Sequence, residues 1–452
     1  MKRRILVIGG LAAGPTAASK AKRVDPDADV ILYEQGEHIS YGICEIPYLL
    51  SGEVSENEKL ILFSPAALHD KKGVTAHTSH VVEEIIPYAS EIRVRDLHSR
   101  LSRAEKYDRL IIATGSTPRK LGIDGEGSRN VFIIKDLGEA FALKKYLDEE
   151  KPRRALIIGG GFIGIEMADA LVRRGIETTI LHNGSMPMSK FEEDARKILL
   201  SEIETHGVSF VPRSKVEWLG RGSRGNVVAA GTKDRTIETD LVIVAVGVEP
   251  NSGLAKSAGI HTGVSGGISV DDKMRALGAE HVYAAGDCCE VRNTVTRKPM
   301  YVSLATLASK TARIAGENAA GGGAVFKGAL RAIGLRVFSK EAAQVGLSSA
   351  EAEEASFDVV LESVTTDSRV AMMPGAGKVA ITLIADRRSR KLLGANVIGE
   401  SGAILRANAL AVAIRHGLTI DDVEQFDLIY TPPYAPLWDG IIIGARKMKK
   451  RI

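Results

Sequence analysis

One sequence pattern occurs twice in this chain, and it constrains the fold more than any other feature. Each copy has a short apolar run, a glycine-rich turn, a stretch of helix-forming residues and a second apolar run. The copies occupy residues 5–33 and 155–181, about 150 residues apart. This order is typical of a βαβ unit whose glycines let the backbone approach a pyrophosphate at a helix N-terminus. Two copies therefore predict two dinucleotide-binding domains.

The first turn keeps two of the three glycines that such units carry. Gly9 and Gly14 stand at the outer positions, and Leu11 replaces the middle glycine. Glu34 follows at the end of the second apolar run, where its carboxylate can accept hydrogen bonds from ribose hydroxyls. A glycine-rich turn between a strand and a helix, with an acid in this place, indicates a nucleotide site. The alternative is a plain tight turn.

The second turn has all three glycines but lacks the acid. Gly159, Gly161 and Gly164 occupy the three positions, and His182 stands where the carboxylate would be. A carboxylate repels a 2′-phosphate, whereas an imidazole does not. We therefore expect tolerance of both NADH and NADPH, unless His182 is simply an exposed residue at a strand end.

Further apolar runs complete the prediction of an α/β fold. Three continuous runs, at residues 110–113, 241–246 and 281–285, have the character of strands buried on both faces of a parallel sheet. A Gly/Ala stretch over residues 319–324 is predicted to be a linker. Beyond it, alternating and helical patterns indicate a separate α+β domain, with strands near 358–362, 379–385 and 391–398 and helices near 404–416 and 420–426.

These patterns divide the chain into three parts. We predict two Rossmann-like dinucleotide-binding domains and a C-terminal α+β domain. The first domain is built from residues 1–117 and 249–323, the second from 118–248, and the third from 324–452.

Charge and hydropathy exclude several classes of function. The 452 residues contain 60 Lys and Arg against 56 Asp and Glu, and the net charge of +4 is too small to indicate binding to nucleic acid or to an acidic membrane. No run of about 18 apolar residues is present, so no membrane-spanning helix is expected. Three cysteines cannot form a disulfide framework in so long a chain, which favours a reducing, cytoplasmic compartment. We expect no metal site.

Cys44 stands alone in the segment SYGICEIPY, residues 40–48. We expect it in the N-terminal part of a helix, where the helix dipole favours a thiolate. No second cysteine is near enough in sequence for a local redox disulfide, so Cys44 would work as a mixed disulfide with a small thiol or as a sulfenate. The alternative is a buried, inert cysteine, as we expect for Cys288 and Cys289.

Together, several motifs resemble the FAD-dependent pyridine nucleotide–disulfide oxidoreductases, over essentially the whole chain. VIGGLAAG at residues 7–14 is similar to their FAD turn, including an aliphatic residue for the middle glycine. Thr114 with Gly115, and Gly286 with Asp287, match two later FAD motifs. The segment around Cys44 resembles that of the single-cysteine branch, which comprises coenzyme A-disulfide reductases, NADH oxidases and peroxidases, and NAD(P)H persulfide or polysulfide reductases.

The resemblance implies FAD and NAD(P)H as cofactors, with Asp287 at the ribityl chain. It also implies a homodimer, because DLIYTPP at residues 427–433 resembles a dimerisation-domain motif whose tyrosine, here Tyr430, reaches the active site of the other subunit. Ser40 is expected near the substrate. Lys20 and Lys22 would meet the phosphates of a coenzyme A-like substrate, although a solvated basic face explains them equally well.

Two departures from the family pattern bear on the chemistry. Glu45 stands beside Cys44 where many relatives have a small residue, and a carboxylate that points inward disfavours a thiolate. Met372 and Met373 stand where the family often has two tyrosines, which removes a hydroxyl that could assist thiol chemistry.

Three functions fit the sequence. The first is NAD(P)H-dependent reduction of a low-molecular-weight disulfide or persulfide, such as coenzyme A disulfide, through Cys44. The second is an NAD(P)H oxidase or peroxidase that uses a Cys44 sulfenate. The third is a flavoprotein electron carrier or redox sensor in which Cys44 is only structural.

Overall fold

A five-stranded parallel sheet forms the centre of the first domain in the computed structural model, which describes residues 2–452. Its strands, in spatial order, are β18 (Val282–Ala284), β7 (Arg109–Ile112), β1 (Arg4–Ile8), β2 (Asp29–Tyr33) and β3 (Thr75–His77). The two segments predicted for this domain therefore share one sheet, since β18 pairs with β7.

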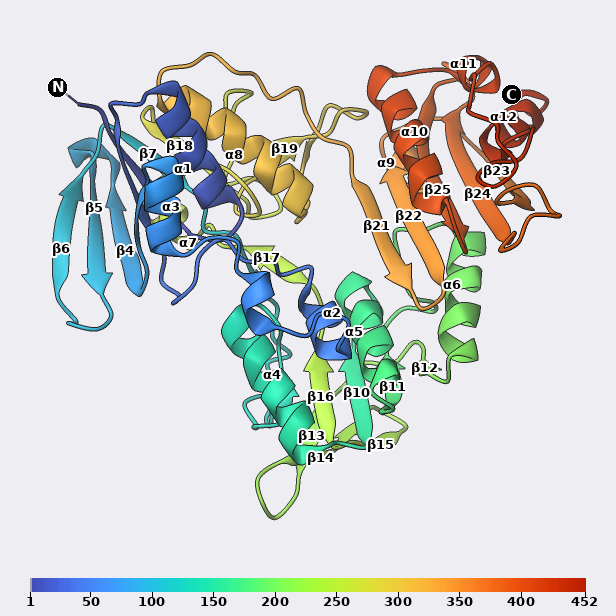
Figure 1. The fold of residues 1–452 in the computed structure, drawn as a ribbon, viewed down its shortest axis with the longest axis horizontal. Helices are drawn as coiled ribbons and strands as arrows, with labels where there is room; N and C mark the ends of the chain where they lie inside the picture. The colour runs from blue at the N-terminus through green and yellow to red at the C-terminus, as the bar shows by residue number, and fades with distance from the viewer. Residues whose placement is uncertain (1) are drawn as a thin grey trace.

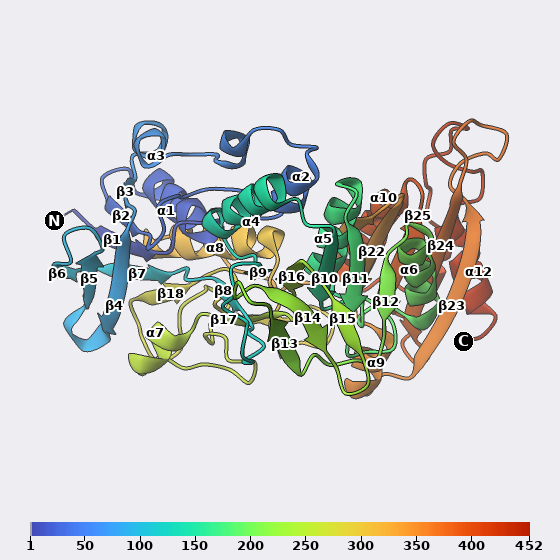
Figure 2. The same cartoon turned by 90° about the horizontal axis from the view of Figure 1, so that it is seen from below.

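Two helices pack closely together against this sheet. They are α1 (Ala13–Val24) and α8 (Ala305–Ala319), which lie side by side in Figures 1 and 2. A Cβ added to Gly316 of α8 would lie 2.2 Å from the carbonyl oxygen of Ala17 in α1, so only glycine permits this approach. The domain also contains β4 (His80–Ile86), β5 (Glu91–Asp96), β6 (Ser102–Lys106), β19 (Val291–Arg292), β20 (Pro299–Met300), α3 (Pro65–Lys72), α7 (Gly253–Ser257) and the 3-10 helices Asn57–Leu60 and Pro87–Ala89.

The second domain repeats the plan. Its parallel sheet has the order β12 (Ser209–Val211), β11 (Glu177–Leu181), β10 (Arg154–Ile158), β16 (Leu241–Val244) and β9 (Val131–Phe132). The chain enters and leaves through an antiparallel pair, β8 (Ser116–Pro118) and β17 (Val248–Pro250). The other elements are α4 (Leu137–Glu150), α5 (Phe162–Arg173), α6 (Glu193–Thr205), β13 (Trp218–Arg221), β14 (Val227–Gly231) and β15 (Thr236–Glu238).

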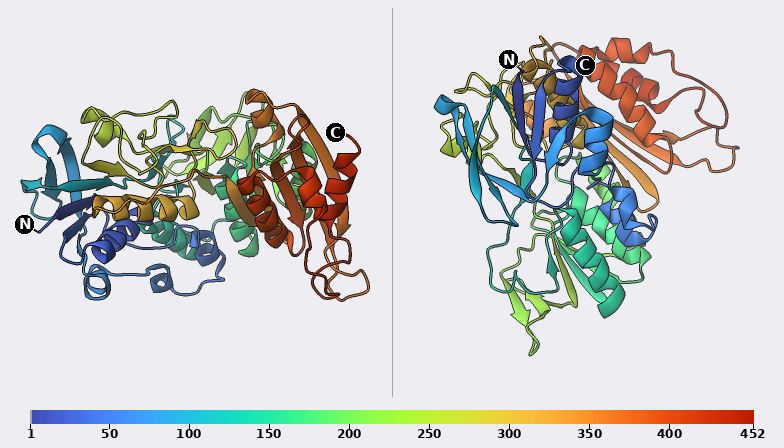
Figure 3. Two further views of the ribbon diagram at one scale, coloured as in Figure 1. Left: turned by 90° about the horizontal axis from the view of Figure 1, so that it is seen from above. Right: turned by 60° about the vertical axis from the view of Figure 1, so that its left-hand side comes forward.

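The C-terminal domain is built on an antiparallel sheet and forms one end of the elongated molecule (Figure 3). Its strand order is β21 (Ala332–Val337), β22 (Lys340–Gly346), β25 (Leu392–Gly399), β24 (Lys378–Asp386) and β23 (Val359–Asp367). Helices α10 (Ala403–His416) and α12 (Gly440–Lys449) pack on this sheet. The domain also contains the short helices α9 (Ser349–Glu354) and α11 (Ile420–Glu424). The structure confirms the predicted fold class.

The central strands are buried almost completely, as their continuous apolar sequences predict. In β1, β10 and β16 the buried side chains are Ile, Leu, Val and Ala at no more than 6% exposure. The apolar run at residues 241–246 forms a strand only as far as Val244. The backbone then passes beside Gly159 of the second glycine-rich turn. None of the helices within residues 2–452 combines the length and apolar character needed to span a bilayer.

Candidate active site

The first glycine-rich turn joins β1 to α1. Gly9 has a φ of +107°, and a Cβ there would lie 2.2 Å from a carbonyl oxygen at the end of β7. A Cβ on Gly14 would lie 1.7 Å from the carbonyl oxygen of Gly9, so α1 can begin here only with glycine at both positions. Glu34 accepts a hydrogen bond from the Gly10 N–H at 2.6 Å, which orients the carboxylate beside the turn.

The polar groups beyond this turn fit a flavin dinucleotide. The Asp287 carboxylate accepts hydrogen bonds from Ser303 Oγ and, at 3.3 Å, from Ser116 Oγ, and burial raises the pKa of Asp287. The buried hydroxyl oxygen of Tyr301 has no hydrogen-bond partner within residues 2–452. A buried phenol without a partner near this carboxyl indicates that a polar ligand satisfies it. FAD would lie along the turn, with its polar chain between the Glu34 and Asp287 ends of the site.

Thr114 and Gly115 form a third part of this cradle. Thr114 Oγ1 donates to the Asn251 carbonyl at 2.6 Å, and Asn251 Nδ2 donates back to the Thr114 carbonyl at 2.9 Å. Gly115 adopts a φ of +69°, and Gly286 adopts +80°. These two segments end the neighbouring strands β7 and β18, so the fold brings the three predicted FAD motifs to one edge of the sheet.

The second turn has the same steric constraints and a different acceptor. A Cβ on Gly164 would lie 1.9 Å from the carbonyl oxygen of Gly159, but a Cβ on Gly161 would meet no atom within 4 Å. His182 Nδ1 accepts the Gly160 N–H at 3.1 Å. Burial and the charge of Arg196 lower the pKa of His182, so the imidazole is neutral. The open backbone at Gly161 fits the pyrophosphate of NAD(P)H.

Cys44 lies in a turn, not in a helix as predicted. Helix α2 (Ile46–Ser51) begins two residues later and has only six residues, so its dipole is weaker than that of a long helix. The side chain of Cys44 is exposed, whereas Cys288 and Cys289 are buried, and none of the three forms a disulfide.

The electrostatic surroundings of Cys44 oppose a thiolate. Partial desolvation, followed by the charges of Glu45, Glu166 and Asp287, raises the pKa of the Cys44 thiol. The prediction that the Cys44 thiolate is stabilised is therefore wrong for the protein without bound FAD or NAD(P)H. Helix α2, which follows Cys44, packs against α5 of the second domain. Cys44 therefore stands near the junction of the two domains.

A charged cluster fixes α2 against the other two domains. Arg336 of β21 lies over the Tyr48 ring at 4.9 Å, pairs with Glu53 at 2.9 Å and approaches Asp169 of α5 at 3.3 Å. Glu166 is one helical turn from Asp169, and burial raises the pKa of Glu166 to about 7. Sequence reasoning missed this cluster, because Arg336 is 283 residues from Glu53 and no local pattern links them.

The residues expected to bind substrate are not all free to do so. Lys20 Nζ lies 2.7 Å from Glu317 Oε2, and Lys22 Nζ donates to the Ala28 carbonyl at 2.7 Å, so each ammonium group already has a protein partner. Ser40 is buried with a φ of +50°, and its N–H donates to the Gly10 carbonyl at 2.8 Å. Ser40 therefore supports the FAD turn directly.

Tyr430 and Cys44 belong to different parts of the chain. Tyr430 lies in the segment between α11 and α12 of the C-terminal domain, at one end of the molecule, whereas the turn with Cys44 precedes α2, which lies near the middle (Figures 1 and 2). Exposed apolar side chains surround Tyr430 in sequence, including Ile429 at 85% and Tyr434 at 78% exposure. Within residues 2–452 no group of three or more His, Cys, Asp or Glu could hold a metal ion.

Comparison with known proteins assigns this architecture. The family described as pyridine nucleotide-disulphide oxidoreductase matches residues 3–312, and its dimerisation domain matches residues 334–439. The chain belongs to the pyridine nucleotide-disulphide oxidoreductase family. It is an FAD-dependent oxidoreductase that uses NAD(P)H, which confirms the family, the cofactors and the class of enzyme predicted from sequence.

Three relatives show the range of activities near this chain. An NAD(P)H coenzyme A polysulfide/persulfide reductase of Pyrococcus horikoshii is 32% identical, with 99% of each chain covered. The structure of an NAD-dependent persulfide reductase from A. fulgidus is 33% identical with a TM-score of 0.95, covering 99% of this chain and 83% of that one. A water-forming NADH oxidase from Lactobacillus brevis is 28% identical with a TM-score of 0.94, covering 100% and 99%.

Proposed function

We propose that this enzyme uses NAD(P)H to reduce a low-molecular-weight persulfide or disulfide of the coenzyme A type, with Cys44 as its redox centre. The position of Cys44 carries the proposal. It is the exposed cysteine of the chain, and it directly precedes α2, which packs against α5 of the NAD(P) domain. The names of the P. horikoshii and A. fulgidus relatives support the choice of a sulfur substrate.

The chemistry is thiol–disulfide exchange at Cys44. FAD, when bound, supplies two-electron transfer from NAD(P)H to sulfur. The Cys44 thiolate attacks one sulfur of the substrate, forms a mixed disulfide and releases the other half as a thiolate. Two electrons then cleave the mixed disulfide, which returns Cys44 and the second thiol. Tyr430 of a second copy would donate a proton to the leaving thiolate.

The second glycine-rich turn supports use of both NADH and NADPH. Where Glu34 presents a carboxylate to the first turn, the neutral His182 occupies the same place in the second. A 2′-phosphate meets no negative charge there. The residues proposed to hold NAD(P)H are Gly159, Gly161, Gly164 and His182, and those proposed for FAD are Gly9, Gly14, Glu34, Thr114, Gly115, Gly286 and Asp287.

We also propose a homodimer in a reducing, cytoplasmic compartment, with no nucleic-acid or membrane partner. The match to a dimerisation domain and the exposed apolar segment around Tyr430 support the homodimer. Three free cysteines support the compartment. The domain limits stay as predicted: residues 1–117 with 249–323, 118–248 and 324–452.

Anaerobic turnover tests the proposed function. Wild type, Cys44→Ser and the matched control Cys289→Ser are assayed with NADH or NADPH against coenzyme A disulfide and coenzyme A persulfide. We expect turnover by wild type and Cys289→Ser, and loss of at least 100-fold in Cys44→Ser. If neither sulfur compound is reduced but aerobic enzyme consumes oxygen at a similar rate, the oxidase function replaces the one proposed here.

A further inference from the structure

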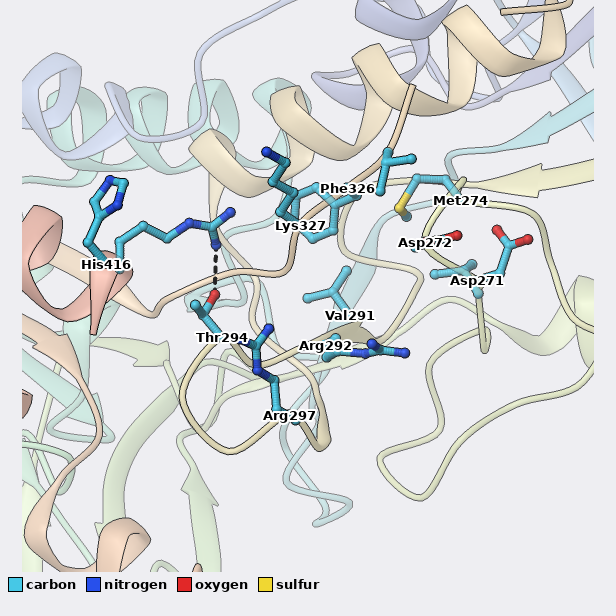
Figure 4. A pocket seen from close by; sticks show the side chains of 13 residues that line it. Asp271, Asp272, Met274, Val291, Arg292, Thr294, Arg297, Phe326, Lys327 and His416 are labelled. Carbon is cyan, nitrogen blue, oxygen red and sulfur yellow. Dashed lines mark hydrogen bonds between the residues drawn. The ribbon is translucent and has the colours of Figure 1, made fainter. Parts of the chain in front are cut away.

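A cleft of about 500 Å³ lies where the first domain, the linker and the C-terminal domain meet (Figure 4). Its walls come from residues 270–274, β19 and the loop to β20, residues 325–327 between α8 and β21, and the C-terminal end of α10. Neither Cys44 nor any residue proposed to bind FAD or NAD(P)H lines this cleft. This volume is typical of sites that enclose a small organic ligand.

Four positively charged side chains line the cleft and have no acidic partner among the described residues. They are Arg292, Arg297, Lys327 and Arg415, and none lies within 4.0 Å of a carboxylate in residues 2–452, although ion pairs are frequent elsewhere in the chain. Arg415 is also fixed, because its Nη1 donates to Thr294 Oγ1 and to the Gly328 carbonyl, both at 2.7 Å. Its guanidinium keeps further N–H donors for an anion.

The acidic groups of the cleft offset little of this charge. Asp271 accepts the N–H groups of Lys273 and Arg275 and pairs with the Arg275 side chain at 2.9 Å. Asp272 is the one lining carboxylate without a side-chain partner among the described residues, and Figure 4 places it across the cleft from His416. The cationic end is therefore suited to an anion with more than one negative charge.

Most of the remaining lining side chains are apolar. Phe326 lies between Lys327 and Asp272 (Figure 4), where its aromatic ring can pack against a planar base. We infer that the cleft binds a nucleoside diphosphate, with its phosphates at Arg415, Arg297 and Lys327 and its base over Phe326. Such a ligand would connect the FAD domain to α10 of the C-terminal domain.

Calorimetric titration of the FAD-loaded enzyme with ADP tests this inference. Saturating NAD⁺ is present throughout, so that the second glycine-rich turn is occupied. We expect wild type to bind one ADP per subunit, more weakly as salt rises. The double variant Arg297→Ala/Lys327→Ala should bind at least tenfold more weakly, and the neighbouring control Lys298→Ala, outside the cleft, should bind within twofold of wild type.

Three results would overturn the inference. They are no binding of ADP to wild type, equal binding to the double variant, and binding of inorganic pyrophosphate as tight as that of ADP, which would remove the role of the base. Flavin absorbance and NADH turnover show whether each variant is folded. If the double variant is not, the single variant Arg297→Gln provides the same comparison. Because sulfur reduction is not measured, the outcome is independent of the proposed function.

Discussion

The two glycine-rich turns of this enzyme are sterically alike and chemically different. In both, the first glycine has a positive φ and the last approaches the carbonyl oxygen of the first so closely that a Cβ is excluded. The equivalent acceptors differ, because Glu34 is a carboxylate and His182 is a neutral imidazole. The glycines thus fix how a helix follows a strand, and we propose that the residue at the next strand end selects the ribose.

The middle position shows the same separation of roles. A Cβ at Gly161 would meet no protein atom, and Leu11 stands at the equivalent position of the first turn. The folded protein therefore does not require glycine there. Two positions after the last glycine, the first turn has Thr16 and the second has Glu166, whose charge contributes to the raised pKa of Cys44.

The largest expected effect comes from the shared constraint. Gly14→Ala should lose FAD and destabilise the protein by about 1–3 kcal/mol, since its Cβ has no room beside the Gly9 carbonyl. Gly164→Ala should retain FAD and raise the KM for NAD(P)H at least tenfold. Flavin absorbance per subunit and steady-state kinetics measure both, and loss of FAD from Gly164→Ala would show that the turns are not independent.

Glu166 should make stability depend on pH. Its folded-state pKa of about 7 lies above the value of 4.5 for an exposed glutamate, so the native state binds more protons than the unfolded state between these values. Stability should therefore fall as pH rises from about 4.5 to about 7, by at most about 3 kcal/mol. Urea unfolding from pH 5 to pH 8 should show a flatter profile for Glu166→Gln, and identical profiles would contradict the buried carboxyl.

Exchanging the acceptor should change coenzyme preference. His182→Glu places a carboxylate where the first turn has Glu34, so it should favour the ribose hydroxyls of NADH and repel NADPH. We expect the ratio of kcat/KM for NADH to that for NADPH to rise about tenfold, equivalent to about 1.4 kcal/mol. His182→Gln is the uncharged control, and an equal change in that variant would argue against a charge effect.

The smallest effect is expected at the open position. Gly161→Ala adds a Cβ that meets no atom within 4 Å, so its cost should stay below about 1 kcal/mol, the difference between Gly and Ala at a helix N-cap. Thermal unfolding of this variant beside Gly164→Ala measures the contrast. A loss as large as that of Gly164→Ala would show a contact at Gly161 that the structure lacks.

Local patterns predicted the parts of the molecule that depend on local sequence. Both turns, the buried strands and the three-part division follow from apolar runs and glycines within about 30 residues. The surroundings of Cys44 could not be predicted in this way, because they depend on Glu166 and Asp287 from two other segments. The partners of Lys20 and Lys22, and the contact of Arg336 with Tyr48 and Glu53, likewise need residues that only the tertiary structure brings together.

An anaerobic reductive titration tests most directly whether Cys44 is the redox centre between the two turns. The enzyme is first treated with coenzyme A disulfide, freed of excess reagent and then titrated with NADH while the flavin absorbance is followed. FAD and a mixed disulfide each accept two electrons, so wild type and Cys289→Ser should consume about two equivalents of NADH per subunit and Cys44→Ser about one. Consumption of one equivalent by all three proteins would contradict a redox role for Cys44.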